Sequence, residues 1–120
     1  MPPPPFGYEK PEPVDHDEAL AVFAGENCDL ISQTIVGLAL HDSESEWVES
    51  QCWRLAEHSD PFVRGTAGLC LGHLARRFGR VRARSWEVVR RLCDDPVVDN
   101  RPCDGLDDLR VFAGPEPDEM

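Results

Sequence analysis

The sequence has no long apolar run, and this absence excludes several classes of protein. No segment approaches the roughly 20 apolar residues that a membrane-spanning helix needs, and no apolar signal segment stands at the N-terminus. We therefore expect a soluble, cytoplasmic protein with no membrane partner. The 120 residues, of which 41% are hydrophobic, are enough for one core but leave little room for a second domain.

Motifs for catalysis and cofactor binding are also missing. The sequence has no GxSxG nucleophile elbow and no Gly-rich phosphate loop. His73 follows Cys70 by one helical turn, but zinc needs three or four ligands. Adjacent carboxylates such as Asp107 and Asp108 point about 100° apart on a helix, so they do not converge on a substrate. We expect a protein that is not an enzyme and that holds no metal or cofactor.

Basic residues are scarce and unevenly placed. The net charge is −11, and lysine is nearly absent. Residues 1–60 carry 13 acidic and 2 basic residues, residues 61–93 carry eight arginines and one acid, and residues 94–120 carry nine acids and two arginines. Either the three blocks neutralise one another within the fold, or the acidic surface attracts a basic protein. The acidic balance disfavours nucleic acid and anionic membranes as partners.

The five cysteines are odd in number and form no CxxC pair. Each lies in or beside an apolar helical pattern, where cysteine behaves as a small hydrophobic residue. In the absence of a secretory signal, we expect all five to be reduced thiols that pack in the core.

The composition divides the chain into three parts. Residues 1–14 contain six of the eleven prolines and have little to bury, so we expect a disordered leader. Residues 15–114 carry the apolar periodicity of a folded helical domain. Residues 115–120 form a short acidic tail, which we expect to be loose.

Capping residues and 3.6-residue apolar spacing predict six helices between residues 15 and 114. The predicted starts lie at Asp15, Asn27, Ser43, Asp60-Pro61, about residue 82, and Asn100. The helix from Asp60 to Gly79 is apolar around most of its circumference, which predicts that it is the central one. No segment alternates with period 2, so we predict an all-α fold without strands.

A shift of 35 residues brings part of the chain into register with itself. Asp60-Pro61-Phe62-Val63 then falls on Asp95-Pro96-Val97-Val98, and Gly79 falls on Gly114. Ala67 falls on Pro102, which must shorten the later helix. A period of about this length, built from helix pairs, is typical of an α-solenoid.

The segment from Ser59 to Ala67, continuing through Leu71-Gly72-His73-Leu74-Ala75, resembles a HEAT repeat. The HEAT pattern has a turn Asp, then Val-Arg, then a small residue that opens the second helix. The resemblance implies a short, armadillo-like α-solenoid of about six helices, in which Asp60 and Arg64 stabilise the stack. It is good over residues 43–79 and weaker over 17–42 and 81–114, and the later unit lacks the Arg.

The chain also resembles small, acidic bacterial HEAT-like proteins, some of which act as immunity proteins. Each of those binds a basic toxin domain delivered by a rival cell. The resemblance implies a non-catalytic protein-binding module that covers a basic toxin domain with an acidic helical face.

Candidate partner-binding residues lie at the start of the third predicted helix. Glu46 and Glu49 are one turn apart and share an exposed face with the acids just before them. This face is either simply solvated or it binds a basic partner, with Trp47 or Trp53 as the apolar anchor. Trp47 and Trp53 point to different sides, so one of them is expected to be exposed. The predicted binding residues are Asp42, Glu44, Glu46, Trp47 and Glu49, with Asp107 and Asp108 as a second group.

The sequence is also compatible with two alternative functions. The block Arg76–Arg91 resembles a nucleic-acid patch, with Arg76, Arg77, Arg80, Arg82 and Arg84 as its contacts. Pairing of these arginines with the acidic C-terminal helix is the competing interpretation. The other alternative is a general scaffold or adaptor.

Overall fold

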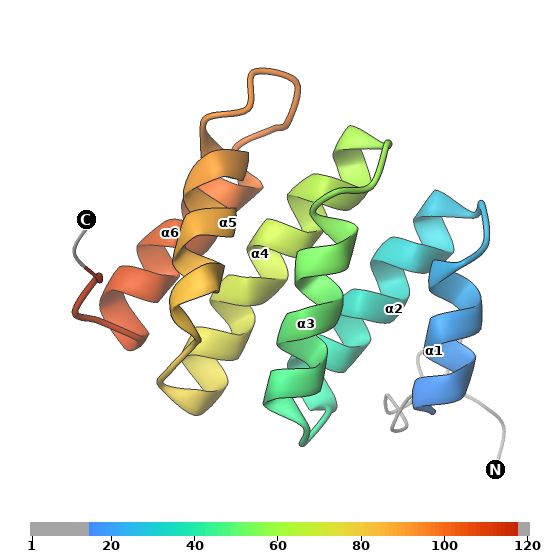
Figure 1. Ribbon diagram of the computed structural model, residues 1–120, viewed down its shortest axis with the longest axis horizontal. Coiled ribbons are helices and arrows are strands. Elements are labelled where there is room, and N and C mark those ends of the chain that lie inside the picture. Colours follow the sequence, from blue (N-terminus) through green and yellow to red (C-terminus); the bar gives the residue numbers. More distant parts are fainter. Residues whose placement is uncertain (1–14, 118–120) are drawn as a thin grey trace, which may run out of the picture.

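The computed structural model describes residues 15–117, which form six α-helices and no strand (Figure 1). The all-α prediction is confirmed. The Pro-rich leader and residues 118–120 of the predicted tail lie outside the described residues. No helix within residues 15–117 is long and apolar enough to cross a membrane. The helices are α1 (His16–Phe23), α2 (Cys28–His41), α3 (Ser45–Leu55), α4 (Pro61–Phe78), α5 (Ala83–Cys93) and α6 (Arg101–Phe112).

The six helices pack in two layers, and helices that follow one another along the chain alternate between the layers. Helices α1, α3 and α5 make one layer, α2, α4 and α6 make the other, and successive helices run in opposite directions (Figure 1). Helix α4 packs against α2, α3, α5 and α6, so it is the central helix, as predicted. Its buried residues lie around most of its circumference, including Val63, Ala67, Cys70, Leu71 and Leu74.

Side-chain caps account for the start of three helices. Asp15 accepts from the Asp17 amide, Asn27 from Leu30, and Asp60 from Phe62. Gly79 ends α4 in the left-handed conformation that glycine adopts without strain.

The predicted cap at Ser43 is wrong. Helix α3 begins at Ser45, and its N-cap residue, Glu44, makes no side-chain capping bond. Instead, Asp42 accepts a hydrogen bond of 2.8 Å from the Glu44 amide. The turn into α3 is therefore stabilised by Asp42, one residue earlier than the sequence pattern indicates.

Small residues allow α4 and α6 to approach closely. A Cβ on Gly68 would lie 2.8 Å from the Pro102 ring, and one on Gly105 would meet the backbone of Gly68. Gly72 on α4 lies equally close to α6, because a Cβ there would lie 2.8 Å from the Gly105 Cα. Helix α6 has 12 residues against 18 in α4, which agrees with the predicted shortening at Pro102.

Two cysteines differ from the prediction of five reduced thiols. Cys93 at the end of α5 and Cys103 in the first turn of α6 form a disulfide, with their Cα atoms 4.8 Å apart. Cys52 and Cys70 are buried free thiols and Cys28 is a half-buried one. The prediction failed because the α5–α6 connection turns back on itself and brings together two residues that the sequence separates by ten positions.

The start of the predicted loose tail is attached to the domain. Glu116 accepts hydrogen bonds from Arg90 at 2.6 Å and from Arg110 at 3.1 Å. These two guanidinium groups belong to α5 and α6, so the carboxylate links the tail to both helices of the last pair.

Candidate protein-binding surface

Two of the predicted binding residues are not on an exposed face. Glu49 is 4% exposed, and its carboxylate accepts hydrogen bonds from the Arg82 amide at 2.7 Å and the Arg82 guanidinium at 2.8 Å. Asp42 is 9% exposed and bonds to the His16 ring at 2.8 Å. The predicted exposed position of these two acids is therefore wrong: both carboxylates are used inside the fold.

The tryptophans are also engaged within the chain. The half-buried Trp47 ring stacks in parallel on the His16 ring, with centroids 3.6 Å apart. The Trp53 indole N–H donates to Ser85 at 2.8 Å, and the guanidinium groups of Arg82 and Arg84 lie over its ring. Neither ring is the freely exposed anchor that the sequence predicted.

The remaining predicted residues form two separate groups. Glu44 and Glu46 are exposed at the start of α3. Asp107 is exposed on α6, whereas Asp108 is half-buried and pairs with Arg76 at 3.2 Å. Helices α3 and α6 belong to different layers (Figure 1), so the two groups do not share one face.

Most of the basic block pairs within the fold. Besides the Arg76 pair, Arg82 pairs with Glu49, Arg90 with Glu116 and Arg91 with Glu57, while Arg77 donates to the Ala39 carbonyl at 2.8 Å. Acids and bases of the three charge blocks thus pair with one another within the fold. Most of these partners differ from the predicted ones: among the ion pairs within residues 15–117, Arg76 is the member of the block that pairs with an acid on α6.

The three free thiols all have raised pKa values. Burial raises the pKa of the Cys70 thiol to about 12 and that of Cys52 well above its usual range. A hydrogen bond to Asp60, reinforced by desolvation, raises the pKa of Cys28. Thiols with raised pKa values are poor nucleophiles at neutral pH. Within residues 15–117 no group of three or more His, Cys, Asp or Glu side chains could hold a metal ion.

A groove of about 460 Å³ lies between α2 and α4. Its α2 wall contains Ser32, Val36 and Gly37, and its α4 wall contains Thr66 and Leu69. The groove extends from Asp29, Phe62 and Arg101, which all lie at helix N-termini, to His41 at the end of α2. The apolar periodicity of the sequence did not predict this groove. The available signal was Phe62, an apolar residue outside the inward stripe of α4.

The Asp29 end of the groove is built around Arg101. This guanidinium lies over the Phe62 ring at 4.2 Å and donates to the Phe62 carbonyl at 2.9 Å and to the Thr66 hydroxyl at 2.7 Å. Phe62 nevertheless remains 50% exposed. An aromatic face covered by an Arg on one side and open on the other is a common component of protein interfaces.

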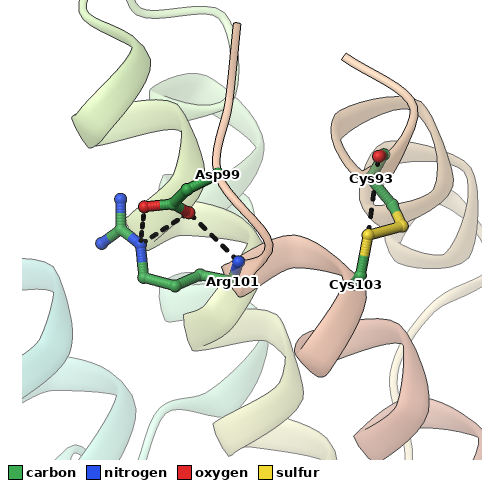
Figure 2. Close-up of a disulfide and its surroundings, with 4 residues drawn as sticks. All are labelled: Cys93, Asp99, Arg101 and Cys103. Atoms are coloured by element: carbon green, nitrogen blue, oxygen red, sulfur yellow. Dashed lines mark hydrogen bonds and ion pairs between the residues drawn. A yellow bond between two sulfur atoms is a disulfide. The ribbon is translucent and has the colours of Figure 1, made fainter. Parts of the chain in front are cut away.

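The connection between α5 and α6 positions Arg101 (Figure 2). Asp99 accepts from both the Arg101 amide at 3.1 Å and its guanidinium at 2.9 Å. The Cys93–Cys103 disulfide lies on the other side of the α6 N-terminus and closes the same connection (Figure 2). Asp95, also in this connection, pairs with Arg64 of α4 at 3.4 Å. Covalent and ionic links therefore hold this groove end in one conformation.

Comparison with known proteins finds a similarity to a solved structure. No model of a known protein family matches the sequence, and no curated protein matches it. Among solved structures, a chain in the crystal structure of a CDI complex from Cupriavidus taiwanensis LMG 19424 is similar to this one. The two chains are 29% identical, with a TM-score of 0.74, over 88% of this chain and 96% of that one. They share one fold.

Proposed function

We propose that this chain is a non-catalytic immunity protein that binds and neutralises a basic toxin domain. One observation carries the proposal: nearly the whole length of a chain from a CDI complex matches it in sequence and structure. Such a complex contains an immunity protein bound to a toxin. The raised pKa values of the buried Cys52 and Cys70 thiols agree with a binding role.

Charge supports a basic partner. The net charge of −11 leaves a surplus of acids after the internal pairs have formed, and Glu44, Glu46 and Asp107 are exposed members of that surplus. Complementary fields of this kind accelerate the encounter of two proteins and select among partners. In this proposal Glu44 and Glu46 contact the toxin, Asp107 belongs to a second, separate contact, and the protein acts in the cytoplasm.

We propose further that the three helix pairs of this chain form a HEAT-like stack. Its support is Arg64, which donates to the carbonyls of His58 and Ser59 in its own turn and pairs with Asp95 in the next turn. A link between successive turns is what a stacked repeat requires. Nucleic-acid binding has less support, because Arg76, Arg82, Arg90 and Arg91 already pair with carboxylates of this chain.

The test is a pull-down at low salt from the native lysate, with and without nuclease. We expect a basic protein that stays bound after nuclease treatment. Its expression alone should stop bacterial growth, and co-expression with this chain should restore it. Recovery of nucleic acid that is lost on nuclease treatment, or a captured protein without toxicity, would overturn the proposal.

A further inference from the structure

We propose that the groove between α2 and α4 is the site where the toxin inserts an apolar side chain that has a basic residue beside it. This inference rests on the proposed function, and it names the part of the surface that contacts the toxin. Three features of the groove carry it: its apolar walls, an unpartnered hydroxyl and an unpaired carboxylate.

The apolar walls indicate what kind of group enters. Val36 from α2 and Leu69 from α4 both line the groove, and Phe62 leaves half of its surface open at one end. A space of about 460 Å³ is larger than any single apolar side chain and admits one together with part of its backbone. Pockets that receive an anchor residue of a protein partner have this combination of concave shape and apolar lining.

The unpartnered hydroxyl belongs to Ser32. The residue is 5% exposed and lines the groove, and its Oγ is the buried side-chain polar atom without a hydrogen-bond partner in residues 15–117. Buried hydroxyls are nearly always hydrogen-bonded. In this proposal the Ser32 side chain rotates toward the groove, and its hydroxyl then bonds to a polar atom that adjoins the inserted side chain.

The unpaired carboxylate decides the charge of the occupant. Arg101 is neutralised by Asp99 at 2.9 Å, whereas Asp29 is exposed and forms no ion pair with any described residue. Asp29 thus places an unpaired negative charge at one end of the groove. A segment that enters beside this charge is matched by a lysine or arginine next to its apolar residue.

The deciding experiment measures binding of an inactive form of the toxin captured in the pull-down above. Gly37→Phe places a ring in the groove, and Gly37→Ala is its matched control. Asp29→Lys reverses the free charge, and Glu87→Lys makes the same charge change on an exposed residue of α5, in the other layer. Circular dichroism and urea unfolding establish that each variant folds.

We expect Gly37→Phe to weaken binding by about 100-fold and Asp29→Lys by about 10-fold, because one excludes the anchor residue and the other repels the adjacent base. Glu87→Lys should stay within about 3-fold of the wild type, and Gly37→Ala, which adds only a methyl group to the groove wall, should weaken binding far less than Gly37→Phe. Ser32→Ala should weaken binding by about 5-fold without destabilising the free protein.

The possible failures are distinguishable. If the wild-type chain does not bind the toxin, the proposed function itself fails, and this inference fails with it. If the wild type binds and both Gly37→Phe and Asp29→Lys bind equally well, the groove alone is the wrong site. A free chain that is dimeric in light scattering and becomes monomeric in Gly37→Phe would identify the occupant as a second copy and overturn the inference.

Discussion

Glu49 and Arg82 form the most complete polar interaction between α3 and the α4–α5 connection. The carboxylate accepts from both the backbone amide and the guanidinium of Arg82 and also from the Ser85 hydroxyl. The same guanidinium donates to the Glu46 carbonyl at 2.6 Å and the Ser50 hydroxyl at 2.9 Å. Glu49, which the sequence pattern places on an exposed face, is therefore buried and links α3 to the α4–α5 connection.

Replacement of Glu49 by Ala should be strongly destabilising. It leaves the Arg82 amide and the Ser85 hydroxyl without their buried acceptor, and we expect the free energy of unfolding to fall by about 3 kcal/mol. Glu46→Ala on the exposed side of the same helix should change it by less than about 0.5 kcal/mol. Urea unfolding of the two variants measures the difference. Equal stabilities would mean that the Glu49 network contributes nothing to folding.

The Cys93–Cys103 disulfide predicts a definite thiol count. Titration of the oxidised protein in denaturant should find three free thiols, those of Cys28, Cys52 and Cys70. Because the bond closes a short connection, Cys103→Ser should lower the free energy of unfolding by about 2–3 kcal/mol. Cys28→Ser, at a half-buried free thiol, is the matched control. Detection of five thiols would contradict the disulfide.

The glycines of α4 and α6 should not tolerate a methyl group. Gly105→Ala directs a Cβ against the backbone of Gly68, where no flexible side chain can yield, and should cost about 1–3 kcal/mol. Gly37→Ala, on α2, should instead stabilise by about 0.5–1 kcal/mol through helix propensity. Thermal unfolding of both variants tests the pair. A stable Gly105→Ala protein would show that α4 and α6 are packed less closely.

Charge reversal at the start of α3 tests the acidic contribution to toxin binding. Glu44→Lys combined with Glu46→Lys should weaken binding by about 10-fold and slow association most at low salt, where charge steering is strongest. Helicity should not change, since both side chains are exposed. Stopped-flow association rates at two salt concentrations provide the measurement. An unchanged rate would place these acids outside the interface.

His73 gives stability a pH dependence of known sign. Burial, together with the nearby Arg76 and against the effect of Asp108, lowers the pKa of its ring from the ordinary value of 6.5. The unfolded chain therefore takes up the proton first, and stability falls as the pH is lowered through that value toward the folded-state pKa. His73→Gln should reduce this fall. Urea midpoints of both proteins at about pH 7.5 and 5.5 provide the comparison. Parallel curves would mean that His73 is not the group responsible.

Local features of the fold were predictable because their causes lie within a few residues. Asp60-Pro61 starts a helix through a cap and a preset backbone angle, and Gly79 ends it through a left-handed turn. Pro102 shortens α6 for an equally local reason. The predicted helix cap at Ser43 was wrong, because Asp42 is the residue that accepts the hydrogen bond in the turn before α3.

The candidate site was less predictable, because its residues come from separate helices. Exposure of Glu49 was inferred from its own helix, yet its burial depends on Arg82, which is 33 positions away. The groove is lined by residues of three helices: Ser32 and Gly37 from α2, Leu69 from α4 and Arg101 from α6. The apolar periodicity of a single helix does not predict how residues of different helices come together.

By itself, the sequence determined the helix count, the central position of the helix from Asp60 to Gly79 and the acidic excess, since these depend on local conformation and on composition. Tertiary structure alone decided which charges are neutralised, which cysteines are joined and where a concave surface remains. Ion pairs, disulfides and grooves depend on distances between side chains of different helices, and packing of the two layers sets those distances.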